Sequence, residues 1–450
     1  MQTSEGTVLW KQIQGCPQGS CSGPAFWNIV ADEILSVQWP QGVHLQAFAY
    51  DFTFIVTDNT REGLRKLRKL ELDKFKDWAN KNKLHVSMEK SSYVLFSKLV
   101  RGATIKWGNP SISRKYHLKY LGVTIDHTLS WLPHVIEQSK RAMDQYQHVC
   151  RISGKTWGIN KNIRRLLYKT VIERTLCHGA AAWGHNMTSR LQKKLDSIQR
   201  LFLLYITGAY RTTPTIAPQV VTGLQPLHLQ IQQEATYARI ARARSSSNFF
   251  TVIFNPTDYE SKSSGIHIHP PPPDFLLHKQ ISLAENHIDS GVKAIYKLLP
   301  FIDQSKFGQT SLSYLKSEIK LVALNTWQDN WDNSETGRSA HDIVPRVSNK
   351  PVEWNREEIM SVRGHGPFSS YLHRFNLRTH DNCSCGEKGD PIHYATKCWF
   401  TLSWHFQIPT VSLKLQWLKN ILTNNLSRTQ LRLLMRFICD ENNLIVEDNN

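Results

Sequence analysis

The spacing of apolar and polar residues predicts a mixed helix and strand region in the first part of the chain. Residues 27–35 have the apolar spacing of a helix, and residues 44–56 alternate as two strands joined by a tight turn. Apolar positions between charged ones at residues 61–84 predict an amphipathic helix. Residues 92–96 and 119–125 each have the pattern of a strand.

The middle of the chain has a helical pattern throughout. Residues 134–244 form a series of such patterns, including residues 162–183 and 191–206. Gly208 follows the second of these where a C-terminal glycine cap is expected. Another helix is predicted at residues 311–331. This part of the chain therefore reads as an all-helical domain.

Serine and proline interrupt the helical pattern at residues 245–310. Serines occupy positions 245–247 and prolines occupy positions 270–273, so we expect an extended and partly stiff linker. Beyond it, two short amphipathic segments are predicted at residues 411–421 and 430–439.

The charge distribution indicates a polyanionic partner. The chain has a formal net charge of +18 and a pI near 9.5. Residues 61–120 contain 16 Lys or Arg against 5 Asp or Glu and therefore carry +11 of that excess, with tryptophans and tyrosines interspersed. Basic groups interleaved with aromatic rings suit contact with phosphate backbones and unpaired bases. The alternative is that these lysines only solvate the outer face of a helix.

Neither a membrane span nor a secretory signal is visible in the sequence, because no stretch approaches about 18 uninterrupted apolar residues. We therefore expect a cytoplasmic or nuclear protein that is not secreted and has no membrane partner. Eight cysteines in 450 residues are too few for a disulfide scaffold. The sequence points to no particular protein partner.

Four short motifs follow one another in an informative order. They are Gly-Cys-Pro-Gln-Gly-Ser at residues 15–20, Phe-Ala-Tyr-Asp at 48–51, Lys90-Ser91, and Tyr-Leu-Gly at 120–122. In this order and spacing the chain resembles the second half of a reverse transcriptase from a non-LTR (LINE-type) retrotransposon. The resemblance runs from about residue 12 through the helical region, and it returns near the C-terminus.

The resemblance implies an α+β fold with four parts. Residues 1–130 would form a partial polymerase palm, and residues 131–244 an all-helical thumb or connection. Residues 245–310 would be the Pro/Ser-rich linker. Residues 311–450 would hold a helical segment and a small C-terminal zinc-knuckle-like region.

The same resemblance implies roles for individual residues in an RNA-directed DNA polymerase that uses Mg²⁺. It places Gln18 and Gly19 at the incoming nucleotide, Asp51 in the catalytic turn as a Mg²⁺ ligand, Lys90 near the triphosphate as a proton donor, and Leu121 and Gly122 at the primer terminus. RNA and DNA would be the partners.

The catalytic turn departs from the family pattern, because Tyr50 stands where the family has its more important acid. Polymerases hold two metal ions with carboxylates, and a neutral tyrosine is a poor Mg²⁺ ligand. The other family acid comes from an upstream motif, yet residues 1–14 contain no aspartate. We therefore expect a dead or severely impaired polymerase that also lacks the preceding fingers region. A more ordinary reading is that Asp51 is only an acid in a tight turn.

A ribonuclease H domain is not visible after the helical region. Members of the group that have one begin it with a strand followed by Thr-Asp-Gly-Ser, whereas here Ala-Ile-Tyr at residues 294–296 is followed by Lys-Leu-Leu at 297–299. Either such a domain was lost, or the chain descends from a lineage without it.

A compact set of metal-ligand side chains lies near the C-terminus. Cys383 and Cys385 are followed by His393 and Cys398, which gives four potential ligands within about sixteen residues. The half formed by His393 and Cys398 has zinc-knuckle spacing, whereas the Cys-x-Cys half is tighter than usual. We expect a Zn²⁺ site; the alternative is a loop with unbound thiols.

Two functional hypotheses follow, together with a weaker third. The chain is either an RNA-directed DNA polymerase by descent, with doubtful activity, or a non-catalytic nucleic-acid-binding remnant of a retrotransposon protein. The missing carboxylates favour the second reading for this chain, and the motifs favour the first for its family. The third possibility is a decayed element with no stable product, since half a palm would leave sheet edges uncovered.

Overall fold

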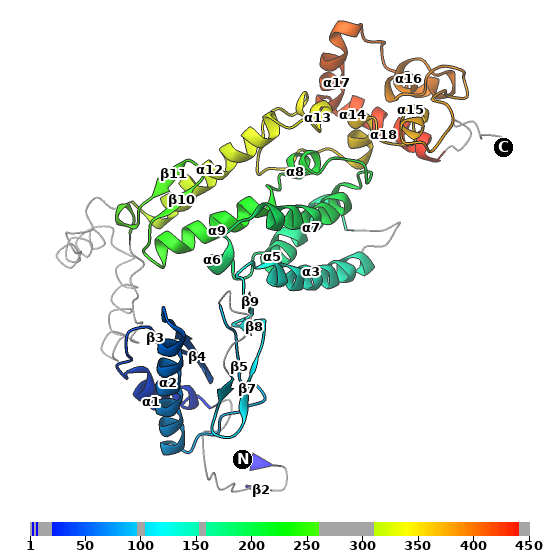
Figure 1. Ribbon diagram of the computed structural model, residues 1–450. Coiled ribbons are helices and arrows are strands. Elements are labelled where there is room, and N and C mark those ends of the chain that lie inside the picture. The colour runs from blue at the N-terminus through cyan, green and yellow to red at the C-terminus, as the bar shows by residue number, and fades with distance from the viewer. Residues whose placement is uncertain are drawn as a thin grey trace, which may run out of the picture. The chain divides into compact units, whose positions relative to one another are not determined.

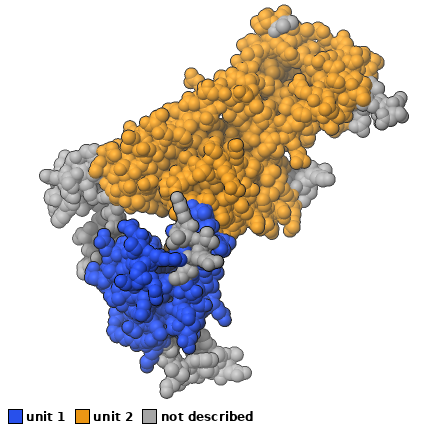
Figure 2. Space-filling model, in the orientation of Figure 1, with its two compact units in different colours: residues 1–118, 126–128 blue, residues 119–125, 129–450 orange. Residues whose placement is uncertain are grey.

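A computed structural model describes most of the chain as two compact units (Figure 2). The described residues are 2–3, 6–7, 20–96, 104–152, 159–260 and 310–440. Unit 1 comprises Met1–Leu118 and Asp126–Thr128, and unit 2 comprises Lys119–Ile125 and Leu129–Asn450. Together they contain both helices and strands, as the sequence predicted (Figure 1).

Unit 1 is built around a β-hairpin and two helices. Its main elements are α1 (Gly23–Leu35), β3 (Val43–Phe48), β4 (Asp51–Val56) and α2 (Arg61–Lys81). The hairpin and both helices confirm the predicted elements. Helix α2 begins where Thr60 caps it, because the Thr60 side chain accepts a hydrogen bond from the Gly63 N–H.

An aromatic core joins the hairpin to α2 in unit 1. Phe52 and Phe54 on β4 lie on the same face of the strand, since side chains two positions apart share a face. Their rings lie 5.1 and 5.4 Å from the ring of Phe75 on α2, and Phe52 also lies 5.4 Å from Trp78. Phe75 and Trp78 are themselves buried. This packing holds the hairpin, and therefore its turn, on a helix scaffold.

Short strands complete unit 1 and continue into unit 2. They are β1 (Gln2–Thr3), β2 (Gly6–Thr7), β5 (Ser92–Tyr93), β6 (Ile105–Lys106), β7 (Ser111–Arg114), β8 (His117–Tyr120) and β9 (Val123–Asp126). Strands β5, β7 and β6 form one sheet in that order, and β8 pairs with β9. The prediction of a single strand at 119–125 was wrong, because Leu121 and Gly122 form a turn there. The strand predicted at 92–96 covers only two residues.

Unit 2 begins with the predicted helical series. Its elements are α3 (Leu132–Ile152), α4 (Lys161–Leu167), a π-helical turn η1 (Tyr168–Ile172), α5 (Glu173–Leu176), α6 (Ala180–Trp183), α7 (Ser189–Thr207), α8 (Ile216–Thr222) and α9 (Leu227–Ala241). The helical character predicted for 162–183 is confirmed except at residues 177–179, where Gly179 has a positive φ of 68° and breaks the helix. The predicted cap at Gly208 is confirmed, with φ 65°.

The main core of unit 2 gathers side chains from α3 to α9. Trp183, Leu195 and Leu203 are fully buried in it, and Val123 and Ile125 of β9 pack against it. Burying a large apolar side chain contributes roughly 1.5–3 kcal/mol, so this cluster is a major source of stability for the unit.

The start of the predicted linker is folded, which corrects the expectation of an extended segment from residue 245. Strands β10 (Ser247–Phe249) and β11 (Val252–Phe254) form an antiparallel hairpin. Phe249 and Phe254 are buried in a cluster with Leu315 of α12 (Leu312–Asp332), and α12 packs along α9 (Figure 1). These apolar residues override the turn-forming serines. After β11 the chain forms a short 3-10 helix, η2 (Pro256–Asp258). Residues 261–309, including the prolines and residues 294–299, lie outside the described residues.

The C-terminal part of unit 2 is a group of short helices. They are α13 (Arg338–His341), α14 (Arg356–Arg363), α15 (Ser369–Arg374), α16 (Pro391–Thr396), η6 (Trp399–Trp404), η7 (Val411–Leu413), α17 (Lys414–Thr423) and α18 (Asn425–Asp440). The helices predicted at 311–331, 411–421 and 430–439 are present, the second of them entered through η7. Throughout the described part of the chain, each helix is too short or too polar to cross a membrane.

A buried ion pair fixes α14 against α18. The Glu358 carboxylate is fully buried, and it accepts hydrogen bonds from the Arg428 guanidinium at 2.7 Å and from Arg432. A half-buried cation, the Lys161 ammonium, donates to the carbonyls of Val352 and Trp354 and so attaches α4 to the segment before α14.

Candidate functional site

The β3–β4 turn presents the two residues that the sequence singled out. Phe48 pairs with Asp51 at the end of the hairpin, so Ala49 and Tyr50 form the turn itself. Ala49 has a positive φ of 51°, and its carbonyl accepts a hydrogen bond from Trp27 Nε1 at 2.7 Å. Helix α1 therefore fixes the conformation of the turn.

The turn exposes its side chains to solvent. Tyr50 is 71% exposed, and its ring lies 4.7 Å from that of Trp27. Asp51 is exposed as well. Among the described residues Asp51 belongs to no group of three or more His, Cys, Asp or Glu side chains arranged to hold a metal. A lone carboxylate can supply only part of the oxygen shell that Mg²⁺ requires.

The other residues assigned to nucleotide binding are not brought to this turn by any observed contact. Lys90 is exposed in the turn before β5, and within the described ranges it makes no hydrogen bond or ion pair with Asp51. Gln18 and Gly19 lie outside the described residues.

Leu121 and Gly122, the residues assigned to the primer terminus, form the turn between β8 and β9. Both have positive φ, 49° and 81°. A Cβ atom at Gly122 would lie only 2.7 Å from His178 Nε2, so both the backbone conformation and the neighbouring imidazole require glycine here. Leu121 is 46% exposed and so remains available for contact.

A buried histidine ties this turn to the helices of unit 2. The Thr124 N–H donates to Nδ1 of His134 at 3.3 Å, and Nε2 of His134 lies 3.0 Å from the His178 carbonyl. One ring nitrogen must accept while the other donates, so the arrangement requires a neutral imidazole. Burial lowers the pKa of His134 and favours that neutral form.

Glu137 of α3 makes a second set of contacts with the β8–β9 hairpin. Its carboxylate accepts from Lys119 Nζ at 2.5 Å and from the Thr124 hydroxyl at 2.6 Å, and Arg141 pairs with it from the next helical turn. The hydrogen bonds from Lys119 and Thr124 lower the pKa of Glu137 to about 2. These contacts hold the β8–β9 hairpin, and with it the Leu121–Gly122 turn, against α3.

The four predicted metal ligands do converge in the structure. The ligand atoms of Cys383, Cys385, His393 and Cys398 all lie within 4.8 Å of one another. The sulfurs of Cys383 and Cys398 are 3.7 Å apart. That separation is far beyond a disulfide bond, and it is close to the roughly 3.8 Å expected between two sulfurs that each bind one tetrahedral Zn²⁺ at about 2.3 Å.

A tight turn and a helix start shape this cluster. The Cys383 N–H donates to the Glu387 carbonyl at 2.7 Å, and Gly386 takes a φ of 92° within the turn. The Asp390 side chain caps α16 by accepting from the His393 N–H at 2.8 Å. The turn thus carries the first two cysteines, while the helix presents the histidine.

The electrostatics of the cluster suit a cation. His393 Nε2 lies 3.1 Å from the Cys385 sulfur, and its Nδ1 lies 3.3 Å from a Glu387 carboxylate oxygen. An outer carboxylate of this kind orients metal-binding imidazoles. Burial raises the pKa of Cys398 to about 12 and lowers the pKa of His393. A thiolate at Cys398 therefore needs a compensating cation, so the donor set fits Zn²⁺.

Three residues that position these sites could not be identified from the sequence. They are Trp27, which bonds the β3–β4 turn, His134, which anchors the β8–β9 turn, and Glu387, which faces His393. For the first two, no local pattern reports a contact between residues 22 and 44 positions apart. The position of Glu387 inside the Cys/His motif was the only available signal.

Comparisons with known proteins agree with the motifs. Residues 3–125 match the family described as reverse transcriptase (RNA-dependent DNA polymerase). The retrovirus-related Pol polyprotein from type-1 retrotransposable element R1 of Bradysia coprophila is 25% identical over 87% of this chain and 35% of its own length. A related R1 polyprotein of Nasonia vitripennis is 23% identical over 85% of each chain.

A more distant match comes from another mobile element. The RNA-directed DNA polymerase from mobile element jockey of Drosophila melanogaster is 25% identical over 43% of this chain and 22% of its own length. No solved structure matches the chain.

The family match defines the class of the first part of the chain: residues 3–125 carry a reverse-transcriptase domain. The chain is similar, at 23–25% identity, to Pol polyproteins of R1 retrotransposable elements and to an RNA-directed DNA polymerase from the mobile element jockey. The chain spans about a third of the length of the first R1 relatives that it matches.

Proposed function

We propose that this protein is a non-LTR retrotransposon reverse transcriptase whose polymerase centre is impaired and whose remaining function is to bind nucleic acid. The observation that carries the proposal is Tyr50 at the tip of the β3–β4 hairpin, beside a single exposed Asp51. Two-metal phosphoryl transfer requires several carboxylates around the metals. Mg²⁺ is the ion that Asp51 would help to hold, and one carboxylate with a neutral phenol holds it weakly.

RNA and DNA are the proposed ligands. The net charge of +18 and the basic segment at 61–120 support this choice. We assign residues 1–130 to a partial palm and the helices of residues 131–244 to a thumb-like part, with the Leu121–Gly122 turn at the primer and Gln18, Gly19 and Lys90 at the nucleotide. Because RNA and DNA are its proposed ligands, we infer that the protein acts in the nucleus or the cytoplasm.

Zn²⁺ is the proposed ion of the Cys/His cluster. Cys383, Cys385, His393 and Cys398 would hold it as a small zinc-knuckle-like site, and bound Zn²⁺ would neutralise thiolates there. The 3.7 Å separation of the Cys383 and Cys398 sulfurs supports this assignment. Such a site is structural, since four protein ligands leave no open position for chemistry.

An active RNA-directed DNA polymerase is the second candidate. The match of residues 3–125 to reverse transcriptases favours it. Under this hypothesis Asp51 and other groups would hold the metal ions without the acid that the family has at position 50.

Primer extension and binding on the same purified protein distinguish the two candidates. We expect binding of a labelled RNA template annealed to a DNA primer, but no extension with Mg²⁺ and deoxynucleotides. The physical reason is the incomplete metal-ligand set at Asp51. Extension by the wild-type protein would contradict the proposal, and failure to bind either nucleic acid would also contradict it.

Two substitutions at one position test the role of Tyr50 directly. Tyr50→Asp introduces the acid of the family pattern, while Tyr50→Asn has nearly the same shape without the charge. We expect neither variant to extend the primer, because two neighbouring acids in one turn supply only part of the carboxylate set that two metal ions require. Extension by Tyr50→Asp but not by Tyr50→Asn would show that the turn alone limits catalysis.

A further inference from the structure

One aromatic side chain next to the Cys/His cluster is unusually exposed. Trp399 is 61% exposed, and of the tryptophans in the described ranges it alone is classed as exposed. It directly follows Cys398 and begins η6. Single exposed apolar residues are common on proteins, so the support of this ring and the charge around it decide whether it is a binding site.

A second ring supports Trp399 from one side. The rings of Trp399 and Phe400 are stacked, with centroids 4.1 Å apart and planes 21° from parallel. Phe400 itself packs against the buried cluster that contains Tyr394 and Cys398. Phe400 thus covers one face of the indole, and the high exposure of Trp399 leaves room for another flat group on the other face.

Hydrogen bonds fix the backbone that carries the two rings. The Thr401 N–H donates to the Cys398 carbonyl at 2.9 Å, and the buried Thr401 hydroxyl donates to the Tyr394 carbonyl at 2.7 Å. His405 Nε2 lies 2.9 Å from the same Cys398 carbonyl. The ring pair is therefore held in place before any ligand arrives, which reduces the entropy that binding costs.

The charge of this part of the chain is positive. Residues 391–439 contain six Lys or Arg and no Asp or Glu. The three arginines among them pair with acids of α14. Lys397, two positions before Trp399, is exposed and forms no ion pair with the described residues. A phosphate next to a group stacked on Trp399 would therefore meet a free cation and no nearby acid in this segment.

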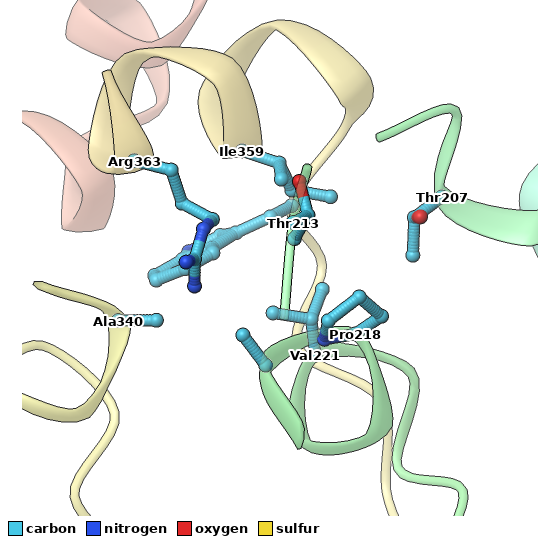
Figure 3. Close-up of a pocket in the computed structure, with 9 residues that line it drawn as sticks. Thr207, Thr213, Pro218, Val221, Ala340, Ile359 and Arg363 are labelled. Atoms are coloured by element: carbon cyan, nitrogen blue, oxygen red, sulfur yellow. The ribbon is translucent and has the colours of Figure 1, made fainter. Parts of the chain in front are cut away.

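The hollow elsewhere in the C-terminal part of unit 2 is too small for a base. Pro218, Val221, Ile359 and Arg363 are among the residues that line it (Figure 3). It has room for about one water molecule, and the surface that it exposes is apolar. A planar ligand of this size fits the open face of Trp399 and not the hollow.

We propose that Trp399 is a stacking platform for an unpaired base of single-stranded RNA or DNA, and that Lys397 contacts the adjoining phosphate. The inference rests on the proposed function, in which the protein binds nucleic acid, and it adds a contact with bases to the phosphate contacts of the basic segment. Every base has an aromatic face, so such a contact accepts any sequence, whereas the bases of a duplex are covered by their neighbours.

Two strands that differ only in their bases test the proposal. A labelled oligothymidylate carries bases, and an abasic oligonucleotide of equal length carries the same phosphates without them. Trp399→Leu keeps an apolar side chain but removes the aromatic face. It should weaken binding of oligothymidylate at least about fivefold and leave binding of the abasic strand near the wild-type value. Trp399→Phe should keep most of the wild-type affinity for both strands.

Two further variants serve as controls. Tyr314→Leu removes another exposed aromatic ring of unit 2, on α12, and should leave the affinity for both strands unchanged. Lys397→Gln should weaken binding of both strands equally and reduce the slope of log affinity against log salt by about 1.

The inference is overturned if Trp399→Leu binds oligothymidylate as tightly as wild type does, or if it loses affinity for both strands equally. The second result would also be expected if the ring docked a protein or only stabilised the fold. If the wild-type protein binds neither strand, the inference and the proposed function fail together. If it binds both strands and Trp399 has no effect, only the inference fails.

Should Trp399→Leu fail to fold, photochemical crosslinking of the wild-type protein replaces it. A single strand that contains 5-iododeoxyuridine should crosslink within residues 397–404, as identified by mass spectrometry of the digested protein. Crosslinks that form elsewhere in the chain but not in this segment would refute the platform.

Discussion

Tyr50 shows how much depends on one side chain at a defined position. The hairpin, its register and the Trp27 hydrogen bond place residue 50 at the tip of the turn, whichever side chain it carries. An acid there would add hard oxygen ligands beside Asp51, whereas a phenol adds an exposed aromatic ring. The backbone therefore sets where residue 50 lies, and the side chain sets what the turn can bind.

His134 is a second residue whose neighbours decide its chemistry. Its buried ring accepts from Thr124 on one side and reaches the His178 carbonyl on the other. A protonated ring could not accept the first hydrogen bond. The neutral ring is therefore part of what holds the Leu121–Gly122 turn.

This arrangement predicts an acid-sensitive hairpin. Because the folded-state pKa of His134 is lowered, its contribution to stability is fully present above the unfolded pKa near 6.5 and is lost as pH falls through the lower folded value. The free energy of unfolding, measured by urea titration between pH 8 and 5, should fall on acidification. His134→Gln should fall less steeply than wild type.

The exposed histidine of the same helix provides the control for this measurement. His148→Gln should follow the wild-type pH profile, since His148 is exposed on α3. Equal slopes for wild type and His134→Gln would show that the His134 contacts do not depend on its charge.

At the scale of elements, one helix end was predicted from the sequence: Gly208 ends α7 with a positive φ. The structure adds three helix starts set by local side chains, because Thr60, Thr188 and Ser311 cap the helices that begin after them. The errors came where tertiary contacts outweighed local preference. Serines predicted an open segment at residue 245, yet Phe249 and Phe254 were buried against α12 and formed a hairpin.

The strand error at 119–125 has the same type of cause. Residues on both sides of Leu121 have the pattern of a strand, but Gly122 lies against His178, a residue far away in the sequence. Gly122 permits a turn at this position, and the packing of His178 and His134 against the hairpin stabilises that turn.

The Cys/His element leads to a prediction about metal removal. Cys383→Ser combined with Cys385→Ser should abolish equimolar zinc that survives desalting, because it removes two of four ligands. The same change should destabilise the region around α14 to α18, where Cys383 and Cys398 lie in the core with Tyr394. Chelation of wild-type protein should reproduce the loss, measured by metal analysis and thermal unfolding.

Cys439→Ser is the matched control, since this cysteine on α18 lies outside the cluster. It should keep one zinc per chain. A wild-type protein that is folded and contains no zinc after expression in zinc-supplemented medium would refute the assignment.

At the scale of the whole molecule, charge is unevenly distributed. The basic excess is greatest at residues 61–120, and α2 presents Lys66 and Lys69 on its exposed side, away from Phe75 and Trp78 in the core. The helix thus uses one face for packing and leaves the other for a polyanion. Exposed cations that contact phosphates release counterions and make binding salt-dependent.

A paired substitution on α2 tests this assignment. Lys66→Gln with Lys69→Gln should weaken binding of RNA and DNA alike and reduce the slope of log affinity against log salt by about 1 for each lysine that contacts a phosphate. Lys316→Gln with Lys320→Gln makes the same charge change on α12 and should leave the slope near the wild-type value. Equal effects of the two pairs would indicate a general charge effect and no specific role for α2.

The sequence by itself determined the resemblance to reverse transcriptases, the main helices, the β3–β4 turn and the composition of the Cys/His cluster. These features depend on residue identity and short spacing, which local physical preferences can report. The tertiary structure decided which distant groups meet: Trp27 with the Ala49 carbonyl, and His134 with the His178 carbonyl. Those contacts arise from burial and packing between segments far apart in the chain, and no local pattern encodes them.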